Sequence, residues 1–75
     1  MAVNAIIRSP EDLGVIIASV RKVHGLTQRQ LAERLQVSQR YVSELELGRP
    51  KIADDRYFRL LALLGIKIRA EIGDA

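Results

Sequence analysis

Residues 38–44 carry the side chains that are best suited to recognise a polar ligand. The stretch reads SQRYVSE. Gln can bond the N6 and N7 edge of adenine, Arg the O6 and N7 edge of guanine, and Glu can accept from N4 of cytosine. On a helix these side chains would share the outward side. Taken alone, such a side is more often an ordinary solvated helix face, and it is the motif around these residues that favours readout of base edges. The candidate base-reading residues are Ser38, Gln39, Arg40, Ser43 and Glu44.

The sequence contains few of the residues that catalysis would need. His24 is the single histidine and cysteine is absent, so the partners that catalysis or a metal site would need are missing. The serines have no neighbouring base to activate a hydroxyl, and the glycines do not form a phosphate loop. We therefore expect no enzyme, no metal and no cofactor, and we assign His24 to the end of a helix, where it complements the dipole.

The base-reading candidates need a helix to present them, and residues 38–48 supply one. Ser38 is an N-cap signal, and Gly48 suits the left-handed position that ends a helix. A shorter helix precedes it, opened by a capping box of Thr27 and Gln30. Two short helices joined by a tight turn make a helix-turn-helix, and a major groove accepts the polar start of the second. The expected inward residues are Leu31, Ala32 and Leu35 on the first helix and Val42 and Leu45 on the second.

The same residues carry a resemblance to a known family. Over roughly residues 9–64, the chain resembles the helix-turn-helix proteins of the lambda-repressor/Cro type, the XRE family. Two positions depart from the family's pattern, Gln36 where Gly is common and Leu47 where a polar residue is common. A non-Gly residue in the left-handed region strains the backbone, so we expect a slightly different turn. The matching residues are Gln28, Leu31, Ala32, Val37, Ser38, Val42, Ser43, Glu46 and Gly48.

The resemblance implies two further roles. In the family, the residue matching Gln28 contacts the DNA backbone, and the residue matching Arg21 pairs with the acid matching Glu46. We therefore expect an Arg21–Glu46 ion pair that links the first helix to the recognition helix. The candidate phosphate contacts, with plain surface charge as the alternative, are Thr27, Gln28, Tyr41, Arg49 and Lys51.

Length and composition indicate one small globular domain over residues 1–75. The chain has 75 residues, 48% of them hydrophobic, and no cysteine, so disulfides are excluded and a reducing compartment suits it. A core this small is often helped by oligomerisation. The net charge of +3 permits nucleic-acid binding without establishing it. We expect no membrane span, because no apolar run approaches roughly 20 residues. We also expect no signal peptide, because the N-terminus lacks a basic n-region and an uninterrupted h-region.

The flanking sequence predicts one helix on each side of the motif at residues 27–48. Ser9 and Pro10 begin the first helix, and Gly25 ends it. A leucine-rich fourth helix starts at residue 53 or 54 and ends at Gly65. The apolar stripe predicted to be buried on the first helix is Leu13, Ile16, Ile17, Val20 and Val23.

Residues 66–72 alternate apolar and charged side chains, which predicts a short β-strand. A lone strand needs a pairing partner for its backbone groups, and the same strand of a second copy supplies one across a twofold axis. Residues 2–7, a strand or a loose arm, are the alternative partner. We expect residues 53–72 to form a homodimer that binds an inverted-repeat operator. The predicted interface residues are Tyr57, Leu61, Leu64, Ile66, Ile68, Ala70 and Ile72.

These features predict a mainly α, four- to five-helix repressor-like domain with a short C-terminal β-strand. The Ser-Pro start, the leucine-rich helix and the basic tail make the chain similar to the HipB-type antitoxins. That resemblance implies a cytoplasmic, nucleoid-associated repressor that controls its own operon and binds a HipA-type Ser/Thr kinase toxin. The alternatives are a phage-type or restriction-control regulator, and a helical protein-interaction module without DNA binding.

Overall fold

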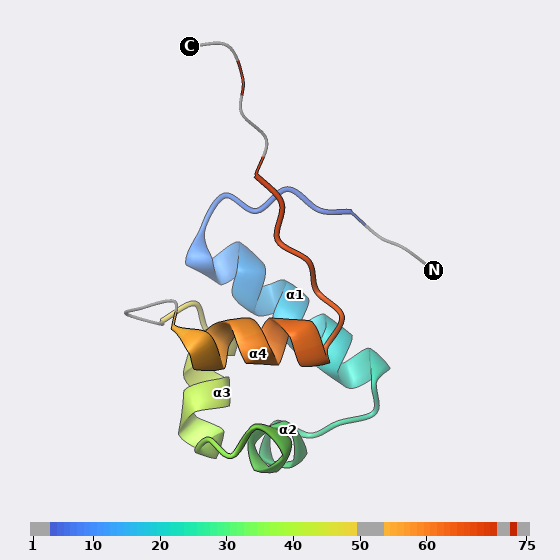
Figure 1. The fold of residues 1–75 in the computed structure, drawn as a ribbon, viewed down its shortest axis with the longest axis vertical. Coiled ribbons are helices and arrows are strands. Elements are labelled where there is room, and N and C mark those ends of the chain that lie inside the picture. The colour runs from blue at the N-terminus through green and yellow to red at the C-terminus, as the bar shows by residue number, and fades with distance from the viewer. Residues whose placement is uncertain (1–3, 50–53, 71–72, 74–75) are drawn as a thin grey trace.

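The structure is a computed structural model that describes residues 4–49, 54–70 and 73. Four α-helices make up this part of the chain: α1 (Pro10–Val23), α2 (Gln28–Leu35), α3 (Gln39–Glu46) and α4 (Asp55–Leu63) (Figure 1). The mainly α prediction is therefore confirmed. Within these residues, no helix has the length and apolar character needed to cross a bilayer. The predicted site residues Lys51 and Ile72 lie outside the described residues.

Each helix begins at a side chain that accepts a hydrogen bond from its open first turn. The hydroxyls of Ser9, Thr27 and Ser38 accept from the N–H three residues further on, at 3.0–3.1 Å. The Asp54 carboxylate does the same for α4 at 3.2 Å, and the Gln30 side chain completes the capping box by accepting from the N–H of Thr27 at 2.8 Å. These bonds satisfy N–H groups that have no partner inside the helix.

All four of these helices also end in the same way. One residue near the end of each adopts a positive φ, and successive backbone N–H groups bond back to the last turn at 2.8–3.2 Å. Gly25, Gly48 and Gly65 hold this position with φ of 71°, 75° and 74°, whereas Gln36 holds it with φ of 57°. Gln36 carries a Cβ, so α2 ends with the backbone strain that its sequence predicted.

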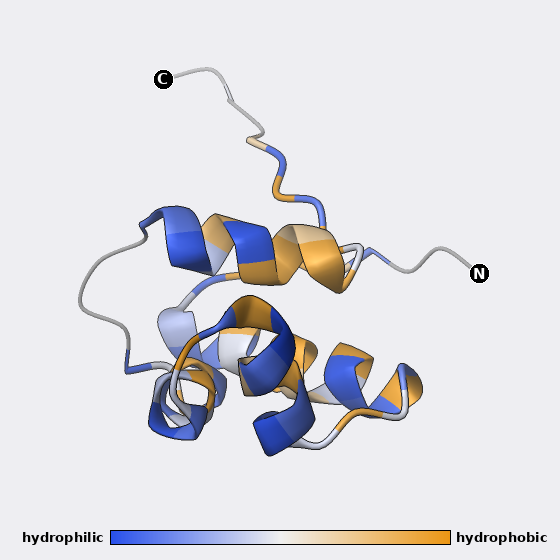
Figure 2. Ribbon diagram, turned by 60° about the horizontal axis from the view of Figure 1, so that its bottom comes forward, coloured by the Kyte–Doolittle hydropathy of each residue, from blue (hydrophilic) through white to orange (hydrophobic). Residues whose placement is uncertain are grey.

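The apolar faces of the four helices meet in one core, as the orange segments of Figure 2 illustrate. Ile17, Leu31, Val42 and Leu60, one from each helix, have no exposed surface (0%). The remaining core residues are Leu26, Ala32, Leu35, Leu45, Tyr57, Leu61 and Leu64. The inward residues predicted for both motif helices are thus buried, and removing them from water stabilises the fold by about 25 cal/mol per Å² of apolar surface.

The buried stripe of α1 is shorter than the sequence predicted. Ile17 is buried and Val20 packs against the core, but Val23 is 86% exposed. Val23 lies in the last turn of α1, two residues after Arg21 and so on roughly the opposite side of the helix. The inward position of that turn belongs to Arg21, of which 8% is exposed. The prediction for Val23 is therefore wrong, because the buried side of α1 passes through Ile17 and Arg21, and Val23 faces away from it.

α1 and α3 come into backbone contact at two glycines. A Cβ on Gly14 would lie 2.7 Å from the carbonyl oxygen of Leu45 and still closer to that of Glu46. A Cβ on Gly48 would lie 2.6 Å from the Cα of Glu11. The end of α3 therefore rests directly on the backbone of α1, and a side chain at either glycine would force the two helices apart.

The β-strand predicted over residues 66–72 is not supported over residues 66–70, the part of that range that the structure describes. None of the described residues is in a strand, and residues 4–8 and 66–70 are irregular. A strand needs a hydrogen-bonded neighbour, and the described part of the single chain does not supply one. Pairing with residues 2–7 is likewise absent over their described part. In Figure 1, residues 4–8 run above α1, whereas residues 66–70 begin at the end of α4 and rise past α1.

Side-chain contacts attach α4 to the C-terminal ends of α1 and α2. Nε2 of His24, at the C-cap of α1, lies 3.2 Å from the carbonyl oxygen of Leu64. The guanidinium of Arg59 donates to the carbonyl of Leu35, at the end of α2, at 3.5 Å. His24 therefore connects α1 to α4, in addition to its place at a helix end.

Candidate nucleic-acid interface

α3 separates its apolar and polar residues onto opposite sides. Val42 and Leu45 are buried in the core. The polar side chains recur at i, i+1, i+4 and i+5, which puts them on one face; the first two are exposed and the other two partly exposed. We call this set, with its N-cap, the polar face of α3. It brings together the predicted base-reading residues Ser38, Gln39, Arg40, Ser43 and Glu44.

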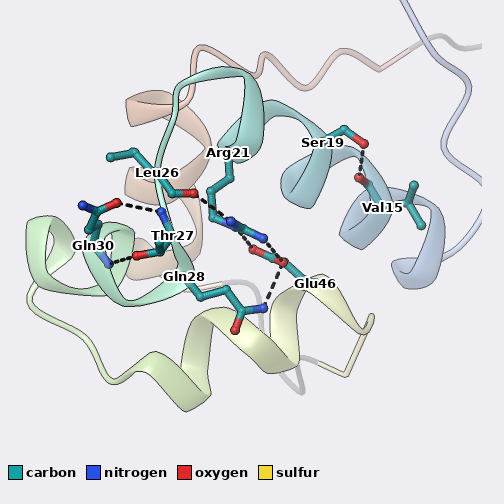
Figure 3. A network of polar contacts seen from close by, with 8 residues as sticks. All are labelled: Val15, Ser19, Arg21, Leu26, Thr27, Gln28, Gln30 and Glu46. Atoms are coloured by element: carbon teal, nitrogen blue, oxygen red, sulfur yellow. Dashed lines mark hydrogen bonds and ion pairs between the residues drawn. The ribbon is translucent and has the colours of Figure 1, made fainter.

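A buried ion pair holds the end of α3 against α1 (Figure 3). Nε of Arg21 lies 2.6 Å from Oε2 of Glu46, and Nη2 lies 3.1 Å from Oε1. The two side chains are 9% and 8% exposed. Nη1 of Arg21 donates to the carbonyl of Leu26 at 2.7 Å. Burial of these charges is tolerated because each is paired and hydrogen-bonded, and the pair fixes how α3 presents its polar face.

Gln28 joins this network, which the sequence did not indicate. Its Nε2 donates to Oε1 of Glu46 at 3.0 Å (Figure 3). The predicted phosphate contact is thus also part of the framework between α2 and α3. Next to it, the Thr27 hydroxyl accepts from the N–H of Gln30 and keeps its own proton to donate. The start of α2 also carries partial positive charge, because the first N–H groups of a helix lack internal partners.

A second polar cluster connects the first turn of α3 to the start of α4. The hydroxyl of Tyr41 donates to Oδ1 of Asp54 at 3.3 Å. The guanidinium of Arg56 lies over the Tyr41 ring, 4.4 Å from its centroid, and pairs with Asp54 at 2.9 Å. Burial, followed by the Asp54 carboxylate, raises the pKa of the Tyr41 hydroxyl, so it keeps its proton at neutral pH. The sequence selected Tyr41 but missed Arg56, since a cation–π contact leaves no local pattern.

Arg49, another predicted phosphate contact, is exposed beyond the far end of α3. Its backbone N–H donates to the carbonyl of Glu44 at 2.9 Å and so helps to end that helix. The backbone of Arg49 is therefore fixed, while its side chain stays accessible to solvent.

Comparison with known proteins agrees with this arrangement of α2 and α3. The family described as Helix-turn-helix matches residues 17–70. The chain belongs to this family. It is 34% identical over 62 residues to an uncharacterised HTH-type transcriptional regulator, y4mF of Sinorhizobium fredii (strain NBRC 101917 / NGR234), covering 83% of this chain and 82% of that protein. The family assignment made from the sequence is confirmed, and the chain is a helix-turn-helix regulator.

Solved structures share the helix-turn-helix fold over nearly the whole chain. A HipB variant in complex with the O2 20mer has a TM-score of 0.79 and 24% identity, covering 96% of this chain and 100% of its own. The HipA–HipB–O2–O3 complex gives 0.78 and 24%, with coverages of 95% and 100%. The clp gene regulator ClgR of C. glutamicum gives 0.70 and 33%, with coverages of 88% and 85%. The predicted HipB-like fold is therefore confirmed.

Some of the predicted dimer residues of this helix-turn-helix chain are buried within the single chain, and others are exposed. Tyr57, Leu61 and Leu64 are buried within the single chain, with 5%, 2% and 2% exposed. Their apolar surface is therefore already covered by the core of the single chain. A second copy would have to cover other residues. The exposed large apolar residues of α4 are Phe58 and Leu63, at 52% and 39%. In the segment after α4, Ile66 packs against the core, whereas Ile68 and Ala70 are exposed.

Proposed function

We propose that this protein is a sequence-specific DNA-binding repressor that inserts α3 into the major groove. The observation that carries this proposal is the polar face of α3, which is open to solvent while the Arg21–Glu46 pair anchors the helix from behind. Gln39 and Arg40, in the first turn, suit adenine and guanine edges. The start of α2, with Gln28, suits a phosphate. The fold likeness to HipB, which has been solved in complex with the O2 20mer, supports DNA binding.

We further propose that the active form is a symmetric homodimer. Phe58 and Leu63 on α4, with Ile68 beyond it, supply apolar surface that the single chain leaves exposed. The alternating residues 66–70 can then pair with their copies across the twofold axis. Two recognition helices about 34 Å apart would contact successive turns of DNA, so the operator should be an inverted repeat.

Within this function, the finer proposal is an antitoxin that represses its own operon and binds a HipA-type kinase. Its support is the fold shared with HipB, which has been solved in a HipA–HipB–O2–O3 complex. A gene regulator of another kind is the second candidate, supported by the 33% identity to the clp gene regulator ClgR. Either role belongs in the cytoplasm, with the nucleoid.

The DNA proposal is tested by selecting a preferred duplex from a random library and measuring binding by fluorescence anisotropy. Arg40→Ala and Gln39→Ala should each weaken the selected duplex by roughly 1–3 kcal/mol and relax the preference at one base pair. Gln28→Ala should weaken all sequences about equally, because backbone contacts carry no sequence information. Arg34→Ala, an exposed cation near the end of α2, is the control. Equal losses on selected and random duplexes would show that the polar face does not read bases.

The antitoxin proposal has a separate test. If a HipA-type kinase is encoded beside this gene, the two purified proteins should form a stable complex in titration calorimetry, with or without the selected duplex. A chain that binds DNA but not such a kinase would be a regulator of the second kind, and one that binds no DNA would be a protein-interaction module.

A further inference from the structure

An ion pair on the polar face of α3 points to a role for Glu44 other than reading a base. Nε of Arg40 lies 3.0 Å from Oε1 of Glu44, one turn later, and the two side chains are 86% and 43% exposed. The guanidinium therefore extends into solvent while the carboxylate holds its inner edge. We propose that Glu44 is a positioning residue that aims Arg40 at a guanine. This inference rests on the proposed function.

The donors of Arg40 divide in a way that fits this role. An arginine carries five N–H donors in one rigid plane. The contact with Glu44 uses Nε, which leaves the two terminal nitrogens as an outward fork. Such a fork can bond O6 and N7 of guanine together. A long side chain loses rotamer freedom when it binds, and a carboxylate that already holds Nε–H reduces that loss before DNA arrives.

The same pair is poorly arranged to stabilise the helix itself. Pairs at i and i+4 are more favourable when the acid comes first, whereas Arg40 precedes Glu44. Arg40 also lies in the first turn of α3 and Glu44 in the last, so each charge lies nearer the dipole end of its own sign. Glu44 free of Arg40 would face the phosphates as a bare negative charge. These points favour a role in recognition over a role in stability.

α2 supplies a matched control for the pair. Nε of Arg29 lies 3.5 Å from Oε1 of Glu33, in the same sequence order, and both side chains are mostly exposed. This pair is not part of the polar face of α3. Glu33→Gln removes the same charge from an exposed pair as Glu44→Gln does, so it reports what loss of that charge does by itself.

The experiment compares wild type, Glu44→Gln, Arg40→Ala, the double variant and Glu33→Gln. Each is measured by anisotropy on the selected duplex, on its single base-pair variants and on random-sequence duplex, at constant salt. Glu44→Gln should reduce, roughly tenfold, the preference at the base pair that Arg40→Ala relaxes. Binding to random duplex should stay equal or tighten, because a negative charge is removed near phosphates. In the Arg40→Ala background, Glu44→Gln should have no further effect on that preference.

Two results would overturn the inference. If Glu44→Gln relaxes a different base pair from Arg40→Ala, or acts equally in both backgrounds, Glu44 reads a base independently. If Glu33→Gln reduces the preference at the same base pair as strongly, the effect comes from the lost charge and not from the orientation of Arg40. A wild type that selects no sequence would overturn the proposed function together with this inference, whereas a selective wild type without Arg40–Glu44 coupling would overturn this inference alone.

Discussion

Gly14 of α1 rests against the carbonyl oxygen of Glu46 at the end of α3, with no space for a side chain between the two helices. The side chain of the same Glu46 bonds Arg21, further along α1. α3 is thus held on α1 by its backbone and by a charge pair at once. The angle of the polar face therefore depends on α1, although none of its base-reading candidates lies there.

Gly14→Ala should destabilise the domain by about 1–3 kcal/mol, because the added methyl overpacks a backbone contact. Helix propensity alone would give the opposite sign, since Ala is the better helix former by about 1 kcal/mol. The measurement is urea unfolding followed by circular dichroism. Ser19→Ala, on the exposed side of α1, is the control and should change stability by less than about 0.5 kcal/mol. An unchanged or higher stability for Gly14→Ala would contradict the close packing.

Arg21→Met and Glu46→Gln should each lower the free energy of unfolding by about 3–5 kcal/mol, because each change leaves a buried partner unsatisfied. The double variant should lose clearly less than the sum, since it leaves neither charge stranded. A double-mutant cycle from urea unfolding gives the coupling energy. The exposed Arg29–Glu33 pair is the reference and should couple by about 1 kcal/mol or less. Coupling near zero for Arg21 and Glu46 would make them independent surface charges.

Gln36→Gly should stabilise the domain by up to about 1 kcal/mol. Its φ of 57° costs a residue with a Cβ about 1–2 kcal/mol, and the greater freedom of Gly in the unfolded chain offsets part of the gain. Gln36→Ala keeps a Cβ in the same conformation and should change little. Thermal unfolding of the three proteins makes the comparison, and a glycine variant that melts below wild type would argue against strain at the turn.

Stability at acid pH should depend on Asp54. The hydrogen bond from Arg56, followed by that from the N–H of Tyr57, holds the pKa of Asp54 below its ordinary value of 3.8. The resulting stability is fully present above about pH 4, the range of an unfolded carboxyl, and is lost as pH falls through the lower folded pKa. Urea unfolding below pH 4 should therefore lose less stability in Asp54→Asn than in wild type. Asp55→Asn, in the same helix turn, is the control, and equal acid slopes in wild type and Asp54→Asn would contradict the assignment.

Phe58→Asp should weaken the proposed dimer without unfolding the chain, because the ring is 52% exposed in one copy. Ile68→Pro should also weaken it, since proline removes a donor from a paired strand. Sedimentation equilibrium measures both, and circular dichroism checks the helices. Val23→Asp changes an 86% exposed apolar residue on α1 and should leave assembly intact. Wild-type assembly in both Phe58→Asp and Ile68→Pro would exclude this surface.

Features encoded by neighbouring residues could be predicted from the sequence. The caps at Thr27 and Ser38, and the left-handed terminator at Gly48, each depend on side chains within one turn of a helix, so their local pattern predicts them. The strain at Gln36 could be predicted for the same reason. The base-reading candidates could be predicted from these caps. Once Val42 and Leu45 are placed inward on a capped helix, the polar residues must lie on the outward side.

Features that depend on which side of a helix the core covers, or on which helices meet, could not be predicted in this way. Val23 continues the apolar spacing of α1, yet it faces solvent on the side opposite Arg21. Tyr57 and Leu61 were assigned to a dimer because α4 is rich in apolar residues, but periodicity does not say which stripe the single chain buries first. The contact of Gln28 with Glu46 and the stacking of Arg56 on Tyr41 join different helices, and no local spacing encodes them.

The turns on both sides of α2 have the same build. In each, a left-handed residue ends one helix, an apolar residue packs against or into the core, and a hydroxyl residue caps the next helix. These residues are Gly25, Leu26 and Thr27 before α2, and Gln36, Val37 and Ser38 before α3. An inserted or deleted residue would displace a terminator, a core side chain or a cap, and would rotate α3 about its own axis. We therefore expect this stretch to accept substitutions during evolution but not changes in length.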